Sequence, residues 1–69
     1  MLKIEFSTEG YAFNDPYAES DWSRMYFRNL EIKRVLKNVC NQLDNGRMSG
    51  SCIDINGNKV GTWSIQEED

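Results

Sequence analysis

The 69-residue sequence predicts a single α+β domain in which one helix packs on one face of a three-stranded antiparallel sheet. Three observations predict this class. The first residues alternate between apolar and charged side chains, the middle of the chain has a helical period, and the last third holds two strand-like runs around an Asn-Gly pair. The expected order is strand, helix, strand, strand, within one domain that spans residues 1–69.

The first strand is expected in the run LKIEF, near the N-terminus. Leu2, Ile4 and Phe6 alternate there with two charged residues, which is the pattern of a strand with one buried face. Residues 7–15 are rich in Ser, Thr, Gly, Asn and Asp, so we expect a connection after this strand.

The helix is expected to begin near Asp15-Pro16, because Asp is a favoured N-cap and Pro a favoured first helical residue. It is expected to end at LDNG, where Asn45 and Gly46 suit a left-handed C-cap. Apolar residues recur with a helical period in the second half of this segment and form one stripe. The expected core, besides one face of the hairpin, is Leu2, Ile4, Phe6, Ile32, Val35, Leu36, Val39 and Leu43. The opposite, polar face of the helix is expected to hold Lys33, Arg34, Lys37, Asn38 and Asn41.

The first half of the helical segment does not follow this register. Tyr26, Phe27 and Leu30 fall on the polar side of the helical wheel. Two alternatives remain open. The helix breaks near Asn29 and the two aromatic residues pack into the core, or the helix is continuous and carries an exposed aromatic patch, which usually marks a contact surface.

The last third predicts a hairpin around Asn56-Gly57, in one of two registers. A two-residue turn pairs Asp54 with Lys59. A three-residue loop pairs Asp54 with Asn58 instead and gives the glycine the left-handed conformation of a G1 bulge.

The register decides which hydrophobic residue lies beside Trp63. The three-residue loop places Cys52 across from Val60 and moves Ile53 to the face of Trp63 and Ile65. A one-residue slip in the pairing of the two strands would send Trp63 and Ile65 to the wrong face of the sheet.

Composition excludes several functional classes. Eleven acidic and eight basic residues give a net charge of −3, which argues against direct binding of nucleic acid. The chain has no histidine, and Cys40 and Cys52 alone provide neither a zinc site nor a disulfide framework, so we expect no metal, no cofactor and no enzymatic activity. No apolar run approaches the roughly 18 residues of a membrane span, and the N-terminus lacks the features of a signal peptide, so we expect a cytosolic protein without membrane contact.

The string GSCIDINGNKVGTWSI, preceded by an amphipathic helix that ends in LDNG, resembles a group of small proteins encoded by phages, prophages and other mobile elements. Their pattern is a short strand, an AF-D connection, one amphipathic helix and a GS-x-x-D-x-NGN-x-VG hairpin. Here AFND spans residues 12–15 and the hairpin motif spans residues 50–61. Residues 17–29 depart from the pattern and look like an insertion.

The resemblance implies an inhibitor of a bacterial defence complex, similar to anti-CRISPR proteins, acting by protein–protein contact in the host bacterial cytosol. The partner would be a larger protein target, of which a nucleic-acid-handling defence complex is one example. The alternative is a small structural or accessory module that buries its aromatic residues and an open strand edge in a homodimer. The candidate partner-binding residues are Glu19, Asp21, Trp22, Tyr26, Phe27, Leu30 and Trp63.

Overall fold

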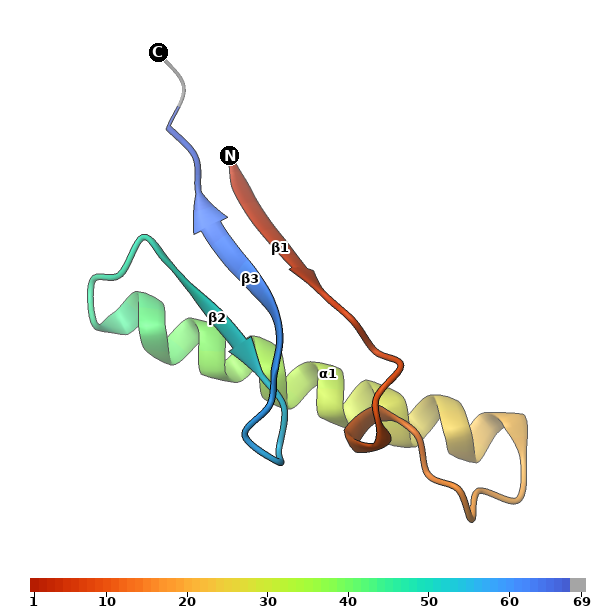
Figure 1. Cartoon of the computed structure of the whole chain (residues 1–69). Helices are drawn as coiled ribbons and strands as arrows, with labels where there is room; N and C mark the ends of the chain where they lie inside the picture. The colour runs from red at the N-terminus through yellow and green to blue at the C-terminus, as the bar shows by residue number, and fades with distance from the viewer. Residues whose placement is uncertain (68–69) are drawn as a thin grey trace.

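The computed structural model describes residues 1–67 and has the predicted α+β architecture (Figure 1). Its three strands form one antiparallel sheet in the order β1-β3-β2, so the strand that comes last in the chain lies at the centre. The elements are β1 (Leu2–Phe6), the 3-10 helix η1 (Tyr11–Phe13), α1 (Asp21–Asp44), β2 (Ser49–Ile53) and β3 (Lys59–Ile65). The predicted fold class and element order are therefore confirmed.

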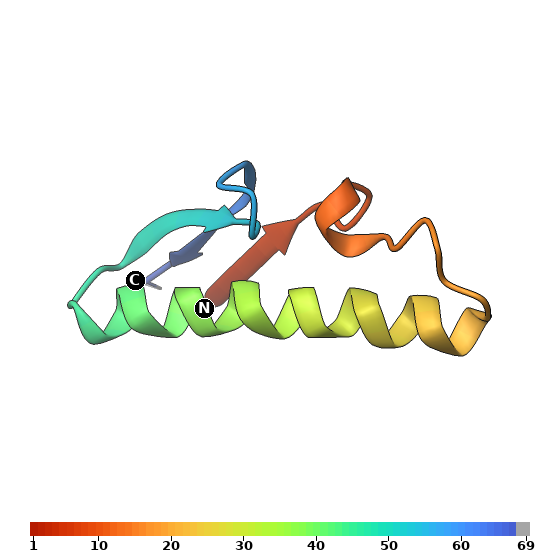
Figure 2. The same cartoon turned by 90° about the horizontal axis from the view of Figure 1, so that it is seen from below.

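The helix is much longer than the sheet that it supports. Figure 2 shows two layers, with α1 in one and the sheet and η1 in the other. The 24 residues of α1 span about 36 Å, whereas strands of five to seven residues span about 17–24 Å. The first turns of α1 therefore extend beyond the sheet, beside η1 and residues 14–20, and the molecule is elongated, with extents of 49 × 22 × 16 Å.

The helix begins later than the sequence predicts. Its N-cap is Ser20, whose side chain accepts a hydrogen bond from the backbone N–H of Ser23 at 3.1 Å. The predicted start at Asp15-Pro16 is wrong. The carboxylate of Asp15 accepts from the backbone N–H of Tyr17 at 2.9 Å, so this pair forms a turn, a role that Asp-Pro serves as readily as a helix start.

The helix is continuous through Asn29, so the alternative with a break at this residue is wrong. The exposed fractions are 52% for Tyr26, 37% for Phe27 and 46% for Leu30, as the continuous-helix alternative requires. The C-terminal cap agrees with the prediction, because Gly46 has a φ of +78° directly after the last turn.

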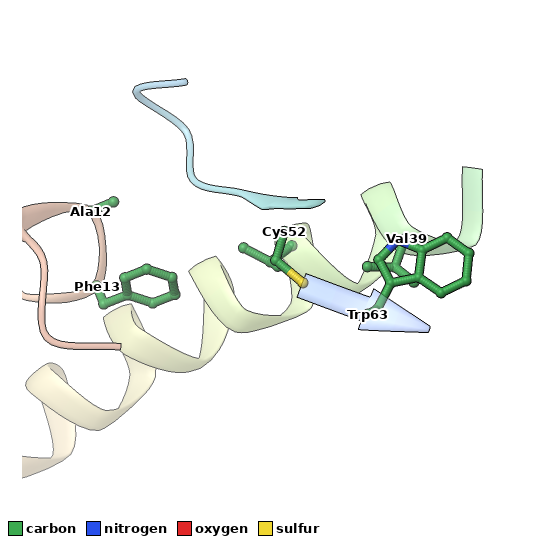
Figure 3. Close-up of a cluster of buried hydrophobic side chains, with 6 residues drawn as sticks. Ala12, Phe13, Val39, Cys52 and Trp63 are labelled. Atoms are coloured by element: carbon green, nitrogen blue, oxygen red, sulfur yellow. The ribbon is translucent and has the colours of Figure 1, made fainter. Parts of the chain in front are cut away.

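The core is small and lies where α1 crosses the sheet and η1. Figure 3 shows Val39 and Trp63 at one end of the buried cluster, Cys52 near its middle, and Ala12 and Phe13 at the other end. Around this centre pack four partly buried residues, Ile4, Phe6, Ile32 and Val60. The buried hydrophobic residues are Ala12, Phe13, Val35, Val39, Cys52 and Trp63.

Three of the expected core residues are exposed. The exposed fractions are 52% for Leu2 and 37% each for Leu36 and Leu43. The helix is rotated about its axis because polar side chains on its other flank bond to the backbone of β2. Arg34 Nη2 donates to the carbonyl of Ile53 at 2.8 Å, and Gln42 Nε2 donates to the carbonyl of Ser51 at 3.0 Å. The predicted polar face therefore lies partly against the sheet.

The hairpin adopts the three-residue loop of the two registers. The backbone N–H of Asp54 donates to the carbonyl of Asn58 at 2.9 Å, and Gly57 has a φ of +82°. Ile53 then pairs with Lys59, as this register requires.

One residue farther from the turn, a β-bulge changes the pairing. Cys52 lies opposite Gly61 rather than Val60, and the register shifts between Cys52 and Ile53. An extra residue on one strand reverses the alternation of its side chains relative to the partner strand. Cys52, and not Ile53 as expected, therefore shares the buried face with Trp63.

Candidate protein-contact surface

A groove of about 510 Å³ lies between η1, α1 and the tip of the β2–β3 hairpin. We call it the hairpin groove. Its walls are mainly apolar, and three separate elements contribute to it because the hairpin tip and η1 both lie against the middle of α1. The residues that line it are Tyr11, Ala12, Phe27, Leu30, Glu31, Arg34, Ile55 and Asn56.

Two side chains at the rim of the hairpin groove are unusually exposed for their type. Tyr11 is 90% exposed and Ile55 is 65% exposed. Each belongs to a tight local structure, a 3-10 turn and a hairpin loop, which directs the side chain outward while the backbone is fixed. Phe27 and Leu30 of α1 continue the apolar surface between them.

An ion pair fixes the base of the hairpin groove. Glu31 is only 7% exposed, and its carboxylate accepts a hydrogen bond from Arg34 Nε at 2.6 Å. The same guanidinium donates to the carbonyl of Ile53, so it connects α1 to the hairpin. A buried carboxylate needs such a partner, because an unpaired buried charge is strongly destabilising.

The carboxylate of Asp54 fixes the loop that carries Ile55. It accepts hydrogen bonds from the backbone N–H groups of Asn58 and Asn56, each at 2.9 Å. The bond from the backbone of Asn58 is the main reason why the pKa of Asp54 lies below its ordinary value, and it outweighs the opposing effect of desolvation. The ionised carboxylate thus holds the loop in one conformation.

A second apolar patch lies on the part of α1 that extends beyond the sheet. The rings of Trp22 and Tyr26 stack with centroids 5.2 Å apart and an interplanar angle of 8°. They are 65% and 52% exposed. Two acidic residues flank this patch. Asp21 pairs with Arg24 at 3.1 Å, and Glu19 is exposed in the preceding loop.

The structure divides the predicted contact residues into three groups. Phe27 and Leu30 line the hairpin groove. Glu19, Asp21, Trp22 and Tyr26 lie on or beside the extended part of the helix.

Trp63 is the exception, and its prediction as a surface contact is wrong. It is 2% exposed, and its indole N–H donates to Gln42 Oε1 at 3.0 Å. It lies in the core because β3 is the central strand and its inner face meets α1. Sequence reasoning missed Tyr11 and Ile55. The signal for Ile55 was its place inside a tight turn, where an apolar side chain has no core to face.

The described residues hold no metal-binding cluster, and one of their two cysteine thiols is buried. Residues 1–67 contain no group of three or more His, Cys, Asp or Glu side chains that could hold a metal ion. Cys52 is buried, and this burial raises the pKa of its thiol, which makes it a poor nucleophile. No helix in the same part of the chain combines the length and the apolar character needed to cross a bilayer.

No protein-family model, curated protein or solved structure matches this chain. The resemblance of residues 50–61 to hairpins of phage and mobile-element proteins therefore stays a prediction.

Proposed function

We propose that this protein is a small phage or mobile-element inhibitor that binds a larger protein of a bacterial defence complex in the host cytosol and blocks it by surface contact. The observation that carries the proposal is the hairpin groove, where Tyr11 and Ile55 are held outward by well-ordered turns. The backbone that carries each side chain is already ordered by local hydrogen bonds, so binding there avoids the entropy cost of ordering a flexible loop.

Contact would centre on the hairpin groove and extend to the stacked pair Trp22 and Tyr26. Affinity in protein interfaces concentrates in a few Trp, Tyr and Arg side chains, each worth about 2 kcal/mol or more when it is an anchor. The net charge of −3, together with the exposed Glu19, favours a partner with a basic surface. Charges at the rim of an interface mainly raise the rate of association.

The test is a plaque assay in a bacterial strain with a defined CRISPR system, infected by a phage that the system targets. The wild-type protein should restore plaque formation, and the purified protein should retain the effector complex on a column. Tyr11→Ala and Ile55→Ser should lose both effects. The matched control is Tyr17→Ala, because Tyr17 is 87% exposed but lies outside the hairpin groove.

One further variant separates the contribution of the hairpin groove from that of the extended part of the helix. Tyr26→Ala should weaken binding, by about 2 kcal/mol if the ring is an anchor, and should leave the fold intact since the side chain is 52% exposed. Normal plaque formation with Tyr11→Ala, Ile55→Ser and Tyr26→Ala would contradict the proposed contact surface. Failure of the wild-type protein against several defence systems would contradict the proposed function.

A further inference from the structure

The free edge of β1 offers a complete set of backbone hydrogen-bonding groups. At one end of the β1–β3 ladder, the N–H of Gln66 donates to the carbonyl of Met1 at 2.7 Å. At the other end, the N–H of Ser7 donates to the carbonyl of Val60 at 2.9 Å. Hydrogen-bonded and non-hydrogen-bonded pairs alternate in an antiparallel ladder, so the odd-numbered residues of β1 bond to β3.

The even-numbered residues, Leu2, Ile4 and Phe6, therefore direct their N–H and C=O groups away from β3. The strand order β1-β3-β2 leaves β1 at the edge, and no other strand within residues 1–67 lies on that side. An open edge of this kind is a template for pairing with another strand.

The sequence of this edge is complementary to itself. In an antiparallel pairing whose two-fold axis passes through Ile4, Lys3 lies opposite Glu5 of the second copy, and Glu5 lies opposite the second copy's Lys3. Leu2 then lies opposite Phe6. Moving the axis by one residue would instead place Lys3 opposite Lys3, or Glu5 opposite Glu5. Opposite charges in directly facing positions stabilise a strand pair, and like charges destabilise it.

The hydrogen-bonding phase agrees with the same axis. In this pairing, the outward N–H and C=O groups of Ile4 meet those of Ile4 in the second copy. The outward N–H and C=O groups of Leu2 meet those of the second copy's Phe6. All three residues thus gain partners for both backbone groups, which is the pattern of a regular antiparallel ladder.

The protein exposes more surface than a compact monomer of its mass. Its accessible surface is 5319 Å², whereas a compact monomer of 8.0 kDa exposes roughly 4,450 Å². The excess is of the same order as the roughly 800 Å² that each partner buries in a standard interface.

Part of that surface lies beside β1. A helix about 10 Å wide covers about two strands spaced 4.8 Å apart, and α1 is tied to β2 and β3 through Gln42. The inner face of β1 is therefore the least covered, and Leu2 is 52% exposed. The flank of α1 on the β1 side of the sheet carries Leu36 and Leu43, each 37% exposed.

We propose that the protein forms a two-fold symmetric dimer by antiparallel pairing of β1 with β1 of a second copy, with Lys3 opposite Glu5 in both directions. The two sheets become one continuous sheet, and both helices lie on the same face of it. Their flanks, with Leu36 and Leu43, face each other across the paired β1 strands. The hairpin groove belongs to the opposite flank of α1, so this dimer does not depend on the proposed inhibitory function.

The test measures the dissociation constant of the purified protein by sedimentation equilibrium, with charge-reversal variants of the paired residues. Lys3→Glu alone and Glu5→Lys alone should each weaken the dimer by about tenfold, because each replaces two attractive pairs by two repulsive ones. The double variant Lys3→Glu/Glu5→Lys should dimerise like the wild type. An equimolar mixture of the two single variants should form a heterodimer that is tighter than either homodimer.

These substitutions do not disturb the protomer. Lys3 and Glu5 are exposed, and their neighbours on β3 are the uncharged Ser64 and Thr62. Circular dichroism should therefore give the same spectrum for all variants. A position-specific readout is hydrogen exchange at Ile4, whose amide should become protected as the protein concentration rises.

Three results would overturn the dimer. The first is a wild-type protein that stays monomeric up to about 1 mM, the weak end of specific association. The second is a pair of single variants that dimerise as well as the wild type, without preference for each other in the mixture. The third is a dimer in which the amide of Ile4 exchanges as fast as in the monomer.

Discussion

Gln42 connects the helix to β2 and β3. Its replacement by Met tests how much this connection contributes to the stability of the fold. Its Oε1 accepts from the indole N–H of Trp63 at 3.0 Å, and its Nε2 donates to the carbonyl of Ser51 at 3.0 Å. A methionine side chain has nearly the same length and fills the same space, so the substitution removes the hydrogen bonds with little change in packing.

The cost follows from the burial of the partners. Trp63 is 2% exposed, so its indole N–H cannot turn to water when its acceptor is lost. A buried donor without a partner costs about 1–3 kcal/mol. Ser51 is only partly buried, so its carbonyl adds less. We expect Gln42→Met to lower the free energy of unfolding by about 2 kcal/mol, which corresponds to a fall in Tm of roughly 8–16 °C in a domain of this size.

Urea unfolding followed by far-UV circular dichroism measures this change. The matched control is Asn41→Met, because Asn41 is exposed on the neighbouring position of the same helix. A double-mutant cycle with Trp63→Phe isolates the hydrogen bond, since Phe removes the indole N–H. The coupling energy should be about 1 kcal/mol or more. A Gln42→Met variant within about 0.5 kcal/mol of the Asn41→Met control, or a coupling energy near zero, would refute the reasoning.

Three further predictions concern the turn, the thiols and the acid limit of stability. Gly57→Val should lower the free energy of unfolding by more than about 1 kcal/mol, because Gly57 has a φ of +82°, and an unchanged urea midpoint would contradict this. Iodoacetamide should alkylate the exposed Cys40 in the native protein and the buried Cys52 only after unfolding, and intact mass with two adducts under native conditions would contradict this. Folding lowers the pKa of Asp54, so the unfolded chain binds a proton at this carboxylate more tightly than the folded protein does. The ionised carboxylate therefore stabilises the fold above the ordinary Asp pKa of about 3.9, and this stabilisation is lost as pH falls below that value. Asp54→Asn should lose less stability at acid pH than the wild type does, because residue 54 no longer titrates. An equal loss of stability in the wild type and the variant, measured by urea unfolding at several pH values, would contradict this.

The sequence was sufficient to predict those parts of the fold that depend on residues close together in the chain. The alternation of Leu2, Ile4 and Phe6 predicted β1, and the pair Asn45-Gly46 predicted the end of α1. Gly57 limited the hairpin to two registers, one of which the structure adopts near the turn. In each case the signal and the structure that it specifies lie within a few residues.

The details that could not be predicted depend on contacts between distant segments. The helical period places Val35, Leu36 and Val39 on one broad face, but the bond from Arg34 to the backbone of β2 decides which edge of that face is covered. Gly61 marked this stretch of β3 as a place where a bulge could form, but only the pairing of β2 with β3 places the bulge at Val60. The bulge determines which residue of β2 shares a face with the central tryptophan.

The candidate contact surface follows the same division. The exposure of Tyr26 and Phe27 could be predicted from their position on the helical wheel, given a continuous helix. The hairpin groove could not, since Tyr11 lies far in sequence from Ile55 and only the packing of η1 and the hairpin against α1 brings them together.

The central place of β3 also has a consequence for synthesis on the ribosome. β1 and β2 have no contact with each other in the sheet, and each pairs only with β3. The pair Leu2 and Ile65 joins nearly the two ends of the described chain, so no part of the sheet between β1 and its partner can form until β3 has left the ribosome. Until then the central strand cannot cover the apolar face of the helix. Folding must close the longest loops at the end, which makes it slow for a chain of this size.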